Sequence, residues 1–78
     1  MLEYTYTQAK SIAIRLKTKR RSKGLTQEKL AEVIDVHVRT IQRTENDEYP
    51  QPATNVLFWI KTAQVLDTSV EYLINGKE

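Results

Sequence analysis

Cysteine is absent from this 78-residue chain, so disulfides and thiolate chemistry are excluded, and the absence agrees with a reducing compartment. Long apolar runs are missing too. The longest, Val56–Ile60, falls far short of the roughly 18 residues that suggest a membrane-spanning helix. The first residues do not resemble a signal peptide. We therefore expect a soluble, cytoplasmic protein that does not contact a membrane.

Groups that could carry out catalysis are equally scarce. The chain has one histidine, no cysteine and no nucleophile–base spacing. Glu28, Glu32 and Asp35 follow an i, i+4, i+7 spacing and could share one helix face. Without a second cluster of ligands, such carboxylates are typical of a solvated face. We predict no enzymatic activity, no cofactor and no metal site.

The length of the chain suits one small domain, near the lower limit for a self-sufficient core, and helical packing fits that size. The net charge is only +2, but it is unevenly distributed. Residues 4–27 contain seven Lys or Arg and no acid, whereas the remainder contains five basic and ten acidic residues. This asymmetry is expected of a protein that binds a polyanion, although a solvated cationic helix explains it equally well.

Two short helices joined by a tight turn are predicted between Thr26 and Asn46. Thr26 suits the N-cap of the first helix, with Leu25 and Leu30 placed as a hydrophobic staple. An apolar stripe follows at helical spacing. Asp35 then interrupts it, and its short polar side chain tolerates the left-handed geometry of a turn at Asp35-Val36.

The second of these helices, from about His37 to Thr44, would bury little more than Val38 and Ile41 and would expose a polar, basic face. Binding to DNA would explain a helix of this composition. The major groove admits an α-helix, in which Arg pairs with guanine, Gln with adenine and an apolar side chain with the thymine methyl. The alternative is an ordinary surface helix of a small bundle.

The flanking segments complete a helical pattern. The first helix should begin near Thr7 and end before Gly24. The preceding arm could be flexible, packed on the bundle or involved in dimer contacts. The residues expected on the inner side of this helix are Ala9, Ile12, Ala13, Leu16 and Arg20.

The second half of the chain begins with a loop at Asn46–Ala53, which contains both prolines. The helix predicted at Thr54–Leu66 is apolar on more than one face, and a last helix at 67–74, capped by Thr68 or Ser69, should end at Gly76. The expected core stripe of the apolar helix is Val56, Trp59, Ile60, Ala63 and Leu66. Off this stripe lie Leu57, Phe58 and Val65, which could pack on the rest of the domain or form a dimer face.

The segment Gly24–Asn46 resembles the helix-turn-helix of the lambdoid phage repressor and Cro family, an XRE-like group. That family has a pattern of the kind GLTQ-x-x-LA-x-x-x-G-V-x-x-x-x-I-x-x-x-E-N/R-G, and the likeness extends from about Ser11 to Gly76. The matching residues are Gly24, Leu25, Thr26, Gln27, Leu30, Ala31, Val36, Ile41, Glu45 and Asn46. The resemblance implies an all-α, compact bundle of about five short helices, a lambda-repressor-like DNA-binding domain over residues 8–76 after an arm at 1–7.

The resemblance also implies a role for individual residues. Gln27 would bind phosphate and brace the reading helix, Arg39 and Arg43 would pair with guanine, and Val38 would touch a thymine methyl. The base-reading positions are Val38, Arg39, Gln42 and Arg43. The implied phosphate contacts are Thr26, Gln27, His37, Thr40 and Asn46, with Lys10, Arg15 and Lys19 as weaker candidates.

Arg20 continues the inner stripe of the first helix, and the resemblance favours a half-buried ion pair with Glu45 over a phosphate contact. The chain departs from the family where Asp35 and Asp47 replace glycines, and both residues can adopt left-handed geometry, though less readily than glycine. His37 stands where a capping Ser or Thr is usual, and facing phosphate or solvent is favoured over metal binding. Thr44 replaces a larger apolar residue. These changes predict modest stability with the fold retained.

Relatives of this kind bind near-palindromic sites as dimers, with half-sites about 34 Å apart. The resemblance therefore implies a repressor-like transcriptional regulator that binds double-stranded DNA as a homodimer. The same fold also serves as antitoxin or adaptor, which leaves open a protein-interaction module with a small protein partner. The acidic second half and the apolar flank of the helix at 54–66 favour that alternative.

Overall fold

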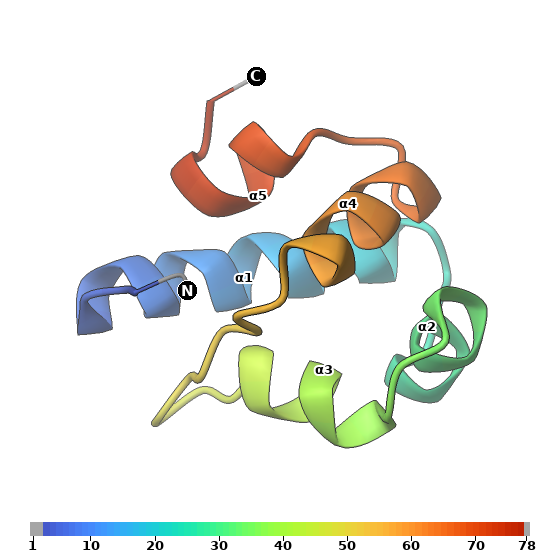
Figure 1. The fold of residues 1–78 in the computed structure, drawn as a ribbon, viewed down its shortest axis with the longest axis horizontal. Helices are drawn as coiled ribbons and strands as arrows, with labels where there is room; N and C mark the ends of the chain where they lie inside the picture. Colours follow the sequence, from blue (N-terminus) through green and yellow to red (C-terminus); the bar gives the residue numbers. More distant parts are fainter. Residues whose placement is uncertain (1–2, 78) are drawn as a thin grey trace.

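The computed structural model describes residues 3–77 and shows five helices within them, with no strand. The all-α prediction, with about five short helices, is confirmed. Met1 and Leu2, at the start of the predicted arm, lie outside the described residues. The five helices are α1 (Tyr6–Ser22), α2 (Gln27–Ile34), α3 (Val38–Thr44), α4 (Val56–Val65) and α5 (Val70–Asn75) (Figure 1).

Local capping explains where the helices start. Thr5 caps α1 in a capping box with Gln8, so the helix begins two residues inside the arm predicted at 1–7. Thr26 caps α2, accepting the Lys29 backbone N–H at 3.0 Å, and Ser69 caps α5. The predicted N-caps at Thr26 and Ser69 are therefore confirmed.

Two glycines with positive φ mark helix ends. Gly24 follows the end of α1 with φ 71°, and Gly76 ends α5 with φ 74°. Glycine has no Cβ to oppose this left-handed conformation, which is why it suits the position after a helix. Both helix ends lie where the sequence predicted them.

The long helix α1 runs through the middle of the molecule, with α4 and α5 on one side of it and α3 on the other (Figure 1). The residues predicted on its inner side, Ala9, Ile12, Ala13, Leu16 and Arg20, are all buried. Of these, Ile12 and Leu16 meet the apolar faces of the other helices in one core. This core contains Ile12, Leu16, Leu30, Ala31, Ile34, Ile41, Phe58, Trp59, Ala63, Leu66 and Leu73.

The predicted core face of α4 is wrong in part. Val56 and Ile60 are 55% and 42% exposed, whereas Phe58 is 3% exposed and packs edge-on against Trp59 with ring centroids 4.9 Å apart. Thr62 is also fully buried. Because α4 is apolar on most of its circumference, its sequence alone does not define which side faces the core.

Among residues 3–77, no helix is long and apolar enough to cross a membrane. The arm residue Tyr4 is half-buried and packs against the core, which selects the packed alternative for this part of the arm.

Candidate nucleic-acid interface

The turn between α2 and α3 has the left-handed geometry that the sequence predicted. Asp35 ends α2 with φ 59° and ψ 52°, and the Val36 N–H donates to Ala31 O at 3.0 Å. His37 then caps α3, because its Nδ1 accepts the backbone N–H of Arg39 at 3.1 Å. The imidazole therefore takes the capping position that a Ser or Thr hydroxyl usually occupies.

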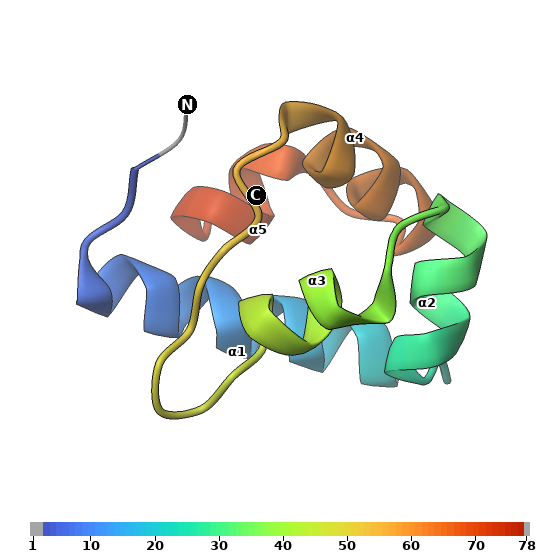
Figure 2. The same cartoon turned by 60° about the horizontal axis from the view of Figure 1, so that its bottom comes forward.

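Helix α3 buries a narrow line and exposes the rest. Ile41 and Thr44 are fully buried, and Val38 is half-buried against the core. Turned toward the solvent are Arg39, Gln42 and Arg43. Figure 2 shows α3 on the surface of the domain, in front of α1. We use the term reading face for these three exposed side chains.

A buried ion pair fixes the C-terminal end of α3. Arg20 Nε and a terminal guanidinium nitrogen each donate to a Glu45 carboxylate oxygen at 2.8 Å, and the two side chains are only 7% and 1% exposed. The hydrogen bond to Glu45 raises the pKa of Arg20 above its ordinary value, against the opposing effect of burial. The pair that the resemblance implied is thus present, with the two-pronged geometry that Arg favours.

Two further contacts connect this pair to the start of α2. Arg20 also donates to the Leu25 carbonyl at 2.7 Å, and Gln27 Nε2 donates to Glu45 Oε1 at 3.1 Å. Gln27 therefore braces α3 through Glu45. One polar cluster joins α1, α2 and α3 and sets the orientation of the reading face.

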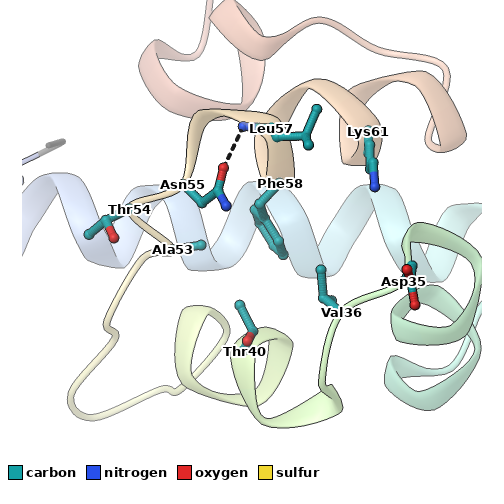
Figure 3. Close-up of a pocket in the computed structure, with 9 residues that line it drawn as sticks. All are labelled: Asp35, Val36, Thr40, Ala53, Thr54, Asn55, Leu57, Phe58 and Lys61. Carbon is teal, nitrogen blue, oxygen red and sulfur yellow. Dashed lines mark hydrogen bonds between the residues drawn. The ribbon is translucent and has the colours of Figure 1, made fainter.

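The other predicted phosphate contacts lie around α3 with varied surroundings. The Thr26 hydroxyl caps α2, and the Asn46 side-chain oxygen accepts the N–H groups of Glu48 and Tyr49 at 2.9 and 2.8 Å. Thr40 lines a cavity of about 330 Å³ between α3 and the start of α4, and its side chain is directed into it (Figure 3). The side chains of Thr26 and Asn46 therefore already make hydrogen bonds within the domain.

Arg15 and Lys19, predicted as weaker phosphate contacts, are directed to α5, on the side of α1 opposite to α3 (Figure 1). Arg15 donates to the Leu73 and Ile74 carbonyls at 3.0 and 2.7 Å, which satisfies the C-terminal end of α5. Lys19 Nζ lies 4.8 Å from the Tyr72 ring centroid. The prediction for these two residues is therefore wrong.

The loop between α3 and α4 lies across α1 and contacts two of its lysines. Lys10 Nζ donates to the Asp47 carbonyl, and Lys17 Nζ lies 2.7 Å from the Asp47 carboxylate. The hydrogen bond from Lys17 lowers the pKa of Asp47 below its ordinary value. The positive-φ residues other than glycine among residues 3–77 are Asp35 and Asp67, so Asp47 does not adopt the left-handed geometry that its residue type allows.

Sequence reasoning missed the placement of Lys17 and Arg21 beside this loop. The available signal was their spacing on α1, one turn apart and on the same side as Lys10. Tyr49 was also missed. It is 75% exposed in the loop that follows α3.

The possible dimer face on α4 is reduced by the structure. Phe58 belongs to the core, so packing on the rest of the domain is the correct alternative for this residue, and Val65 is half-buried against the same core. Leu57 is 52% exposed. It lies with Val56 and Ile60 on the outer side of α4, and these three residues form the surface that we call the α4 patch.

A comparison with family models matches residues 16–73 to the helix-turn-helix family HTH_3. Among solved structures, the SinR chain of the SinR protein/SinI protein complex is similar, with a TM-score of 0.73 and 31% sequence identity. The match covers 82% of this chain and 60% of the SinR chain, so this chain spans less than two thirds of that protein's length. A comparison with curated proteins finds no match. Because the family model covers most of the described helices, the chain belongs to the XRE/Cro-CI type of helix-turn-helix DNA-binding domains, a family that is not enzymatic.

Proposed function

We propose that this domain is a sequence-specific, repressor-like transcriptional regulator that reads the major groove with α3. The observation that carries the proposal is the exposed reading face of Arg39, Gln42 and Arg43 on a helix anchored by a buried ion pair. A reading helix must present its side chains at fixed positions, because a base contact depends on hydrogen-bond geometry. The Arg20–Glu45 pair supplies that fixed position.

In this proposal the side chains of α3 divide the recognition between them. Arg39 and Arg43 lie one turn apart and each carry a guanidinium that suits the O6 and N7 acceptors of guanine. Gln42 suits adenine. Val38 packs partly on the core, and its exposed part would contact a thymine methyl.

Phosphate contacts would hold the helix in register but would not select the sequence. Thr26, Gln27 and His37 surround the N-terminal ends of α2 and α3, where backbone N–H groups favour anions. Thr40, Asn46 and Lys10 complete the proposed set.

We further propose that the chain acts as a homodimer on an inverted repeat. A seven-residue reading helix spans only a few base pairs, and two copies about 34 Å apart would place both helices in successive major grooves. The α4 patch supports this step, since it leaves three large apolar side chains exposed on one helix.

The experiment that tests the proposal is selection from a random-sequence DNA pool at near-physiological salt, followed by sequencing. An enriched inverted repeat with half-sites about one helical turn apart supports a dimeric, sequence-specific regulator. An enriched single half-site supports recognition by α3 and contradicts the dimer. Weak, salt-sensitive binding without enrichment contradicts sequence-specific recognition.

A second candidate function is an antitoxin or adaptor-type protein-interaction module. The α4 patch favours it, because the same surface could receive another protein, and the similar SinR structure is a complex with a second protein, SinI. Equilibrium sedimentation of the purified chain separates the two readings. A dimer that Leu57→Lys converts to a monomer assigns the patch to self-association, whereas a monomer at all accessible concentrations favours a different partner.

A further inference from the structure

The loop that follows the reading helix is held against α1 by three contacts. Lys17 Nζ lies 2.7 Å from the Asp47 carboxylate, Lys10 Nζ donates to the Asp47 carbonyl, and the Tyr6 hydroxyl donates to Glu48 O at 3.0 Å. Figure 2 shows this loop leaving α3 and crossing α1 on the side that also carries α3. An acidic residue therefore lies three positions after the last residue of the reading helix, against cations of α1.

The cations around Asp47 form a line along α1. Lys10, Lys17 and Arg21 are seven and four residues apart, a spacing that places them on one side of a helix. We call these three residues the α1 strip. The pKa of Asp47 is lowered first by its hydrogen bond from Lys17 and further by the charges of Lys17, Lys10 and Arg21. The whole strip therefore acts on this one carboxylate.

We propose that the Asp47 carboxylate is an internal competitor of DNA phosphates for the α1 strip. With the carboxylate in place, the strip contributes less to binding DNA of any sequence, so a larger share of the affinity must come from base contacts of α3. Asp47 then limits the sequence-independent part of the affinity without itself making an attractive contact with DNA. This inference rests on the proposed function, because it assigns Asp47 to the same interface.

The exposure of the pair suits competition. The Asp47 side chain is 84% exposed, and an ion pair in such a position is weak, because water screens both charges. The high density of phosphate charge along DNA can displace so weak an internal partner. A buried carboxylate would instead hold its lysine too strongly for a phosphate to replace it.

Loop structure does not depend on the Asp47 carboxylate alone. The Asn46 side chain holds the N–H groups of Glu48 and Tyr49, and the Gln51 N–H donates to Arg43 O at 2.8 Å. Asp47→Asn therefore removes the charge while the loop keeps its other bonds. The replacement also keeps an oxygen that can accept from Lys17.

Asp67→Asn is the matched control. Asp67 also faces a lysine, the C-cap residue Lys23 that follows α1, with Nζ at 3.8 Å, and the Asp67 side chain is 89% exposed. It lies in the turn between α4 and α5, away from α3 (Figure 1). Both substitutions raise the net charge by one unit, so the difference between them isolates the position of the charge. Asparagine also tolerates the φ of 54° at this position.

The experiment measures the dissociation constants of the wild-type chain and both variants for a random-sequence duplex and for the best selected site, at several salt concentrations. For Asp47→Asn we expect random-duplex affinity to rise about two- to fivefold above that of Asp67→Asn, the size of an exposed ion pair. The dependence on salt should steepen by up to about 0.9 in the log–log slope, one additional phosphate contact. The affinity for the selected site should rise by about the same factor, because phosphate contacts do not select the sequence.

Equal random-duplex affinities for the two variants would overturn the proposal, and so would a loss of affinity in Asp47→Asn, which would assign the carboxylate to holding the loop. The second measurement repeats the comparison in a Lys17→Gln background. There the gain from Asp47→Asn should shrink, because the strip has lost its central cation, whereas an unchanged gain contradicts competition for Lys17. If the wild-type chain binds neither duplex, the proposed function itself fails, which is a different result from any of these.

Discussion

The substitution Glu45→Gln tests whether a buried ion pair determines the position of the reading helix. Glutamine keeps the shape of the side chain and one acceptor oxygen, but it removes the negative charge. The Arg20 side chain is only 7% exposed, so its guanidinium is then buried without a countercharge. Removing one partner of a buried pair costs about 3–5 kcal/mol, because the remaining charge stays out of water. We expect a loss of unfolding free energy in this range.

Such a loss is a large fraction of the stability of so small a domain. At about 0.05–0.15 kcal/mol per residue, a chain of this length has a free energy of unfolding of about 4–12 kcal/mol. Each kcal/mol corresponds to about 4–8 °C in Tm for a domain of this size, so Tm should fall by at least about 12 °C. The assay is thermal and urea unfolding followed by circular dichroism of the helices.

Two controls define the outcome. Glu32→Gln removes an exposed partner of Lys29, an i,i+3 pair at 3.2 Å, and should cost no more than about 0.5 kcal/mol. Arg20→Met combined with Glu45→Leu replaces both charges by apolar groups and should recover much of the stability lost in the single variant. A loss in Glu45→Gln no larger than that in Glu32→Gln would refute the reasoning, since it would mean that water reaches the Arg20 charge.

Three further predictions concern recognition and local stability. Arg39→Ala should relax specificity at one base pair by about 1–3 kcal/mol, measured by competition with single-base variants of the selected site, and equal losses on specific and random DNA would contradict its role. Tyr4→Phe should leave the free energy of unfolding unchanged or raise it by up to about 1 kcal/mol, because the buried Tyr4 hydroxyl has no partner within the described residues. The nearby Trp59 ring N–H donates to Ala53 O at 2.8 Å instead. A clear loss of stability in urea unfolding would show that the hydroxyl makes a hydrogen bond after all. Asp35→Gly should stabilise the domain by up to about 1 kcal/mol, because Asp35 has φ 59°, and a lower Tm would show that the aspartate stabilises the turn in another way.

Local features of the fold could be predicted from the sequence because their causes are local. The inner side of α1 follows from the spacing of Ala9, Ile12 and Leu16, and the start of α2 follows from Thr26 as a cap. The turn at Asp35 follows from the tolerance of a short polar side chain for positive φ. Each of these needs only residues within a few positions of one another.

The face of α4 could not be predicted in the same way. Its orientation about its own axis depends on contacts outside the helix, among them the bond from Trp59 Nε1 to Ala53 O in the preceding loop. Val56 and Ile60 are apolar, as Phe58 is, so a hydrophobic pattern does not separate them. The fully buried Thr62 gave no signal at all, since threonine is mostly exposed in proteins.

The cations of α1 show the same limit for the candidate site. Arg15 and Lys17 are two positions apart on one helix and are chemically similar, yet Arg15 contacts α5 and Lys17 contacts the loop after α3. Their spacing places them on different sides of α1. Which side faces DNA depends on where α3 and α5 pack, and this arrangement comes from the whole core.

The positive charge most available to DNA belongs to the cations that have no partner within the domain. Arg20 is held in a buried ion pair, Arg15 at the C-terminal end of α5 and Lys17 by a loop carboxylate. Within residues 3–77, the guanidinium groups of Arg39 and Arg43 have neither a hydrogen-bond nor an ion-pair partner. An unpaired arginine keeps all five donors for a base or a phosphate. The small net charge therefore says little about affinity, because two uncommitted guanidinium groups lie on the one helix whose position the buried pair fixes.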